Sequence, residues 1–119
     1  MENLNQKQNN ILTWHEFENV RIVVGTIIEV EEFPKAIKPS YKLSIDFGTI
    51  GIKKSSAQIT KRYTKSQLIG KQVVAVINFP PKQIADFISE CLVLGAVGEN
   101  GEVTLLTTDL PVDNGLQIA

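Results

Sequence analysis

Residues 41–70, YKLSIDFGTIGIKKSSAQITKRYTKSQLIG, decide the fold. Apolar side chains occupy positions 41, 43, 45 and 47 and polar ones occupy 42, 44 and 46, which predicts a half-buried strand. Gly48 allows a turn, and a third strand is predicted to follow it. Thr64 and Gln67 stand three residues apart as a capping box, which predicts a short helix over about residues 64–69.

The chain before this stretch predicts a short helix and a long first strand. A second capping box, Thr13 with Glu16, predicts a helix over about residues 13–19, from which Trp14 and Phe17 are expected to dock on the body of the domain. Every second residue from Val20 to Val30 is apolar or Thr, so these residues share one face of a strand. Gly25 lies on the opposite face of that strand and is expected to mark a bend or bulge.

The sequence after residue 70 predicts three further strands and a C-terminal tail. A largely apolar run over residues 72–79 ends at Pro80-Pro81 and predicts strand four. Residues 82–89 are expected to be a loop or a single helical turn, residues 91–97 strand five, and residues 103–107 a short sixth strand.

Three strands, a helix and two strands, in that order, are typical of the OB-fold, a mainly all-β, five-stranded Greek-key barrel. A short N-terminal helix and a C-terminal extension flank it here. An SH3-like barrel or a small sandwich is the competing architecture, and the helix between strands three and four favours the OB-fold. We expect residues 1–12 to be a flexible N-terminal tail and residues 13–119 to form a single domain.

Charge is distributed unevenly along the chain. Residues 35–82 hold ten Lys and Arg against one acid, Asp46, for a net charge of +9, whereas residues 1–34 carry −4 and residues 83–119 carry −6. A cationic stretch of this density attracts polyanions and releases their counterions. The alternative is that these charges only form a solvated surface. Residues 52–63 also combine hydroxyl, amide and aromatic groups with the charged side chains, which favours binding.

Catalysis finds little support in the sequence. His15 is the only histidine, and the single cysteine, Cys91, stands in an apolar run without a second thiol or a nearby histidine. This excludes the usual activated nucleophiles and metal sites, so we expect no enzyme, no catalytic residue, no metal and no cofactor. Without a signal peptide or a long apolar run, we expect a cytoplasmic protein that does not insert into membranes.

Three separated stretches resemble one known family. Residues 53–63, KKSSAQITKRY, resemble the signature segment of the structure-specific tRNA-binding domain family, which includes the C-terminal domain of bacterial methionyl-tRNA synthetase. Residues 17–27 resemble the opening strand of that family, and residues 78–84 with 89–95 resemble its closing half. Within the family the chain is most similar to the CsaA branch of export-related chaperones, and the resemblance covers roughly residues 13–119.

The resemblance implies an OB-fold, a homodimer and affinity for the folded shape of tRNA. For the CsaA branch it also implies binding of unfolded or export-destined polypeptides, with the translocation motor as a further candidate partner. One departure concerns Asp86, which stands where the family commonly has Gly and adds a negative charge near Lys82. Another is the apolar Ile88, near a position that is often basic in the family.

Two hypotheses follow: the protein binds RNA, or it binds polypeptide. Tyr63 is expected either to stack on a base or to pack in the core. The candidate RNA-binding residues are Lys42, Lys53, Lys54, Ser56, Gln58, Lys61, Arg62 and Lys82. The candidate peptide-binding residues, around the Pro-Pro corner, are Phe79, Ile84, Phe87 and Ile88.

Overall fold

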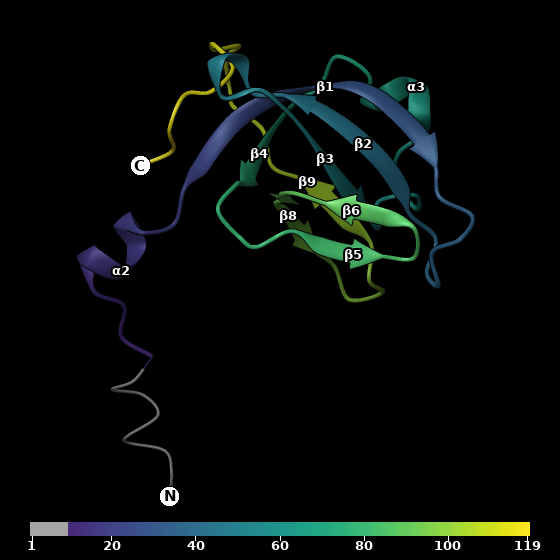
Figure 1. The fold of residues 1–119 in the computed structure, drawn as a ribbon, viewed down its shortest axis with the longest axis horizontal. Helices are drawn as coiled ribbons and strands as arrows, with labels where there is room; N and C mark the ends of the chain where they lie inside the picture. The colour runs from purple at the N-terminus through teal and green to yellow at the C-terminus, as the bar shows by residue number, and fades with distance from the viewer. Residues whose placement is uncertain (1–9) are drawn as a thin grey trace, which may run out of the picture.

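A five-stranded antiparallel sheet, in the order β3-β2-β1-β4-β7, curls into a nearly closed barrel in this computed structural model (Figure 1). The structure describes residues 10–119, so most of the predicted tail over residues 1–12 lies outside the described part. The five strands are β1 Ile22–Glu32, β2 Tyr41–Asp46, β3 Ile52–Ala57, β4 Gln72–Val76 and β7 Leu92–Val93. Helix α3, Lys65–Leu68, lies between β3 and β4, as the OB-fold prediction requires.

The apolar side chains that alternate along β2 fill the barrel interior. Leu43 and Ile45 are 1% and 0% exposed, and Phe47 just beyond the strand is 0% exposed. Val23 and Ile27 of β1 join the same apolar cluster. Burying each of these side chains stabilises the fold by roughly 1.5–3 kcal/mol.

Alternation alone does not specify which face of strand β1 points inward. The inward face carries Val23 and Ile27 rather than the even-numbered residues, and the irregularity in the strand falls between Ile27 and Glu29 rather than at Gly25. The pattern was ambiguous because both faces of β1 are apolar. The other face is buried as well, since Val24 is 1% exposed, and the C-terminal segment pairs with the strand there, where Gly115 N–H donates to the Val24 carbonyl at 2.7 Å.

Gly25 has a packing role instead. A Cβ atom built at Gly25 would lie 2.6 Å from Cγ2 of Ile45 and 2.6 Å from the Phe47 ring. The side chains of the barrel interior therefore press directly against the backbone of β1, and only Gly leaves them the necessary space.

The segment predicted as a loop over residues 82–89 is a β-hairpin. Strands β5, Lys82–Ile84, and β6, Phe87–Ser89, pair antiparallel around a turn in which Ala85 has a φ of 54°. Three-residue strands are too short for an alternation pattern, and a non-Gly residue in the left-handed region gives no turn signal. The prediction for residues 82–89 is therefore wrong.

The predicted fifth strand is divided into two. After β7 the chain continues as β8, Gly95–Val97, which leaves the main sheet and pairs with β9, Val103–Leu105. The turn between β8 and β9 falls at residues 98–101, as the sequence predicts.

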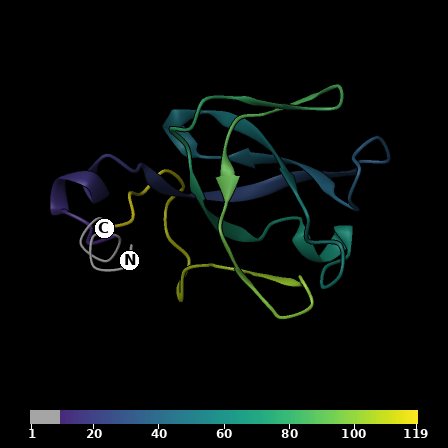
Figure 2. The same ribbon diagram turned by 90° about the horizontal axis from the view of Figure 1, so that it is seen from below.

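Helix α2, Trp14–Glu18, begins at the predicted capping box. Glu16 N–H donates to Thr13 Oγ1 at 3.1 Å, and Thr13 N–H donates to Glu16 Oε1 at 2.8 Å. The helix stands away from the barrel, near the C-terminal end of the chain (Figures 1 and 2). Phe17 is half-buried, but Trp14 is 86% exposed, so the expectation that Trp14 docks on the body is wrong.

Replacing Gly25 by Ala is expected to destabilise the protein by about 1–3 kcal/mol, because the added methyl group overpacks the barrel. In an unstrained strand the same change stabilises by roughly 0.5–1 kcal/mol, so the sign of the effect is diagnostic. The measurement is the free energy of unfolding in urea. As a control, Phe47→Leu should make the Gly25→Ala change less costly than it is in the wild-type background, and a stabilised Gly25→Ala variant would contradict this packing.

Candidate nucleic-acid interface

Strand β3 divides the signature segment into buried and surface residues. Ser55 is 1% exposed and its hydroxyl donates to the Cys91 carbonyl at 2.9 Å, so this serine is structural. Ser56 is half-buried and Gln58 is exposed, and both reach a groove on the surface. Alternation along the strand therefore places one serine in the core and presents its neighbour to a ligand.

The outer edge of β3 is held by the segment that joins β6 to β7. Glu90 N–H donates to the Lys54 carbonyl at 2.7 Å, and Lys54 N–H donates to Glu90 Oε1 at 2.9 Å. Ser56 N–H donates to Ser89 Oγ at 3.4 Å. These bonds close the barrel and fix the β5–β6 hairpin beside β3.

A groove of about 500 Å³ lies between this hairpin and the loop of residues 33–40. Lysines reach it from the loop and from β5, while hydroxyl and amide groups come from β3 and the residue that follows it. Isoleucines on the loop and on β5 add apolar surface. We call this the basic groove, lined by Lys35, Lys38, Ser56, Gln58 and Lys82, with Ile37 and Ile84.

A second hollow, of about 270 Å³, adjoins the basic groove through Lys38 and Gln58, which line both. Lys61 and Gly101 also line it, and Lys61 Nζ donates to the Asn100 carbonyl at 2.7 Å. The structure thus brings four of the candidate RNA-binding residues, Ser56, Gln58, Lys61 and Lys82, to one continuous surface.

The other four candidates lie outside the basic groove. Lys42 Nζ lies 5.4 Å from the ring centre of Phe33 and 5.8 Å from that of Phe87, so this ammonium group lies over both aromatic rings. Arg62 Nη1 donates to Thr104 Oγ1 at 3.0 Å, beside the β8–β9 hairpin. Lys53 and Lys54 lie along β3, away from the groove lining.

Sequence reasoning missed Lys35 and Lys38 as site residues. Both lysines follow Glu31 and Glu32 closely in the sequence and could pair with them. In the structure the glutamates Glu31 and Glu32 lie 4.0 Å from Lys42 and 3.8 Å from Lys65 instead. The loop carries its two lysines away from β1, to the groove. A signal was present, since both belong to the basic stretch of residues 35–82.

Lys35 has an acidic partner across the groove. Its Nζ lies 2.8 Å from Asp86 Oδ2, next to the hairpin turn. The hydrogen bond from Lys35 lowers the pKa of Asp86, and the same bond and charge raise the pKa of Lys35. Asp86 thus stays ionised and offsets one of the positive charges at the rim.

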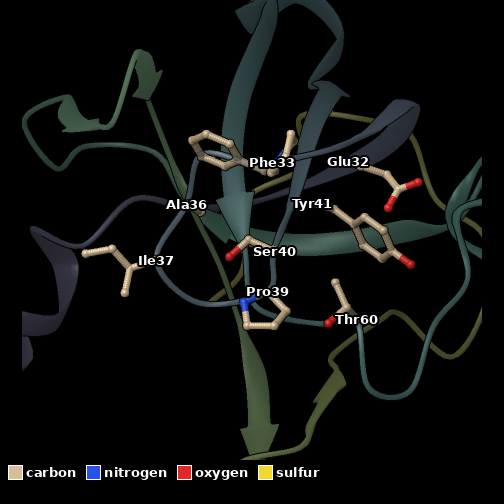
Figure 3. Close-up of a pocket in the computed structure, with 9 residues that line it drawn as sticks. Glu32, Phe33, Ala36, Ile37, Pro39, Ser40, Tyr41 and Thr60 are labelled. Atoms are coloured by element: carbon tan, nitrogen blue, oxygen red, sulfur yellow. The ribbon is translucent and has the colours of Figure 1, made fainter.

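A larger hollow, of about 600 Å³, lies on the other side of the loop (Figure 3). Glu32, Tyr41 and Thr60 surround it, together with Pro39 and Ser40 from the loop. Its lining contains a carboxylate and no Lys or Arg. The basic groove is therefore the better candidate for a polyanion.

Tyr63 packs rather than standing free for a base. Its hydroxyl accepts a hydrogen bond from Leu105 N–H at 3.0 Å, and its carbonyl accepts one from the Tyr41 hydroxyl at 2.9 Å. The ring packs against the apolar cluster of the barrel. Of the two roles considered for Tyr63, this geometry is that of packing.

The four apolar candidates occupy different environments. The Phe87 ring packs edge-on against Phe33, with ring centres 5.4 Å apart, and Ile84 lines the basic groove. Phe79 is 56% exposed and Ile88 is 47% exposed. These two are the apolar side chains of this set that a partner can reach directly.

The described residues offer no metal cluster or reactive thiol. Burial raises the pKa of Cys91 to about 11, so its thiol stays protonated at neutral pH. Between residues 10 and 119, His, Cys, Asp and Glu form no group of three or more that would hold a metal ion. Within the same residues, no helix has the length and apolarity to cross a membrane.

Two solved structures resemble the whole described fold closely. The crystal structure of chaperone CsaA from Bacillus anthracis matches with a TM-score of 0.88 and 49% identity, over 92% of this chain and 99% of that one. The CsaA chaperone protein from Picrophilus torridus matches with a TM-score of 0.86 and 55% identity, over 92% of this chain and 100% of that one. Both are described as chaperones and neither as an enzyme.

Sequence comparison gives a consistent result. The methionine–tRNA ligase of Methanocaldococcus jannaschii is 32% identical over 102 residues, which cover 85% of this chain and only 15% of the ligase. The chain thus spans about 15% of the length of the ligases that it matches. Residues 22–117 match the family described as "Putative tRNA binding domain". The chain belongs to this tRNA-binding domain family and is of the CsaA chaperone type.

Proposed function

We propose that this protein binds folded tRNA and that the basic groove is its contact surface. The observation that carries the proposal is that Lys35 and Lys38 of one loop and Lys82 of β5 line a single groove together with Ser56 and Gln58. Lysines contact phosphates as point charges, while hydroxyl and amide groups suit sugar hydroxyls and base edges. Contacts of this kind grip a folded RNA by its shape and charge.

The lysines of the groove differ in how much of their charge is available. Within residues 10–119, Lys35 is paired with Asp86, whereas Lys38 and Lys82 have no carboxylate within 4.0 Å. Charges without a local partner hold solvent counterions, and releasing those ions favours binding of a polyanion. Lys38 and Lys82 therefore contribute most, and Lys53 and Lys54 form the flank of the surface.

A second function, binding of unfolded or export-destined polypeptide, is favoured by the exposure of Phe79 and Ile88. The likeness to two CsaA chaperones supports it. Exposed apolar side chains beside a cationic surface suit extended chains that have both apolar and acidic residues. A role in protein export in the cytoplasm, with the translocation motor as a partner, belongs to this second proposal.

We further propose that the protein is a homodimer joined through the end that carries α2. Ile11, Leu12 and Trp14 are 71%, 65% and 86% exposed, and Leu116 of the C-terminal segment is 49% exposed. Leu12 and Trp14 border a hollow of about 430 Å³ that also contacts Ala119. A twofold contact here would cover these side chains and present two basic grooves on one particle.

Reversing two groove charges tests the tRNA proposal. The Lys38→Glu, Lys82→Glu variant is expected to bind tRNA at least about tenfold more weakly and to lower the slope of log affinity against log salt by about 1.4–1.8. Filter binding over a salt series measures both. The matched control is Lys65→Glu, Lys71→Glu, which changes the net charge equally outside the groove lining. Equal losses in both variants would refute the groove as the site.

Removing the exposed apolar groups tests the polypeptide proposal. The Phe79→Ser, Ile88→Ser variant is expected to lose most of the ability to suppress aggregation of a chemically denatured model protein, because burial of each large apolar side chain contributes roughly 1.5–3 kcal/mol. Light scattering follows the aggregation. Ile69→Ser, at a side chain 51% exposed beside α3, is the control and should change little. A wild-type protein that suppresses no aggregation would rule the proposal out.

Placing a charge at the end of the molecule that carries α2 tests the proposed dimer. Trp14→Asp is expected to give a monomer of 13.2 kDa, because the carboxylate would be buried at the contact between two copies. Sedimentation equilibrium measures the mass of this variant and of Ile37→Asp, a control at a fully exposed side chain of the groove loop. The control should keep the dimeric mass, and a wild-type protein of monomeric mass would contradict the proposal.

A further inference from the structure

We propose that the basic groove holds one unpaired nucleotide that has left its stack in the RNA. Its phosphates lie at Lys38 and Lys82, and its base lies on the floor formed by Ser56 and Gln58. This rests on the proposed tRNA function and adds to it the structural element that is recognised: a single-nucleotide bulge or an unpaired loop position, rather than a helix.

The size of the groove fits one nucleotide. Its volume of about 500 Å³ lies within the roughly 300–1,000 Å³ typical of small-ligand sites. Residues of the loop 33–40 and of the β5–β6 hairpin form its two walls. The stacked bases of a paired helix cannot enter between such walls, whereas a base that is turned out of its stack can.

The lining offers each part of a nucleotide a suitable partner. Gln58 is exposed, and its amide makes no hydrogen bond among the described residues, so its donors and its acceptor are free for a base edge. The Ser56 hydroxyl beside it can donate or accept. Ile37 and Ile84 supply apolar surface for the faces of the base.

Two contacts hold the walls in place before any ligand arrives. Lys35 pairs with Asp86 at 2.8 Å, and Phe33 packs against Phe87 with ring centres 5.4 Å apart. Both contacts join the segment that follows β1 to the β5–β6 hairpin. A groove that is already formed loses less entropy when it binds, which raises its affinity for a small element.

An extended polypeptide fits this groove less well. A peptide that adds as a strand needs free backbone groups on a sheet edge. On β3, the N–H and carbonyl of Lys54 are already bonded to Glu90, and Ser56 N–H is bonded to Ser89. The lining holds three lysines and no Asp or Glu, which further favours an anionic polymer.

Two RNA hairpins that differ by one nucleotide test the inference. One has a fully paired stem, and the other has the same stem with a single bulged 2-aminopurine. Wild-type protein is expected to bind the bulged hairpin about tenfold more tightly, because the hydrogen bonds of Ser56 and Gln58 to the unpaired base have no counterpart in the paired stem. The 2-aminopurine fluorescence is expected to change as the base moves into the groove, and anisotropy measures both affinities at one fixed salt concentration.

The variant Ser56→Ala, Gln58→Ala is expected to lose this preference while its affinity for the paired hairpin changes less than twofold. Thr49→Ala, Ser66→Ala, which removes two exposed polar groups outside the groove lining, is the matched control and should keep the preference. Thermal denaturation checks that each variant is folded.

The outcomes separate this inference from the proposed function. Equal affinity for the two hairpins, together with intact tRNA binding, overturns the single-nucleotide site and leaves the tRNA proposal standing. Absence of tRNA binding at physiological salt overturns both. If the Ser56→Ala, Gln58→Ala variant loses binding of a denatured polypeptide and keeps its preference for the bulge, the groove binds polypeptide rather than an unpaired base. The inference is then wrong.

Discussion

The closure of the barrel between β3 and the segment before β7 is the constraint on which the rest of the structure depends. Strand β7 has only two residues, so a backbone ladder cannot run along β3. Individual bonds complete the join instead: the buried Ser55 hydroxyl donates to the Cys91 carbonyl, Glu90 N–H donates to the Lys54 carbonyl, and Lys54 N–H donates to Glu90 Oε1. Each such bond contributes only about 1 kcal/mol, but leaving a buried polar group unpaired costs roughly 1–3 kcal/mol. The closure also fixes where the β5–β6 hairpin stands, and hence the second wall of the basic groove.

Sequence reasoning succeeded for the fold where one physical signal dominated. The alternation in β2 specified its buried face, and the capping boxes at Thr13 and Thr64 located both helices, because cap bonds are local. Sequence reasoning failed where two patterns were equally strong, or where the sequence held no pattern at all. Both faces of β1 are apolar, so alternation does not distinguish the face of Val23 from the face of Val24, and both side chains are 1% exposed. The β5–β6 hairpin turns at Ala85, which has no turn propensity of its own, and only the tertiary contacts with β3 define it.

The positive charge of the candidate site could be predicted from the sequence, but not every residue that forms the site could be. A concentration of positive charge in the sequence must form a positive surface somewhere, and Lys61 and Lys82 reach the continuous surface of the two hollows. Which lysines keep their charge available depends on neighbours that are distant in sequence: Lys42 lies over two aromatic rings, and Lys35 meets Asp86 fifty-one positions away. Nothing local to Lys38 indicates that its loop turns toward β3.

Binding of RNA in the basic groove can be followed through the backbone amide NMR signals of ¹⁵N-labelled protein as unlabelled tRNA is added. The account predicts that the largest shifts and losses of intensity fall on three segments together: residues 35–38, 56–58 and 82–86. Residues of α2 and the C-terminal segment should change little. The largest changes at α2, or spread evenly over the barrel with the groove unaffected, would contradict the account.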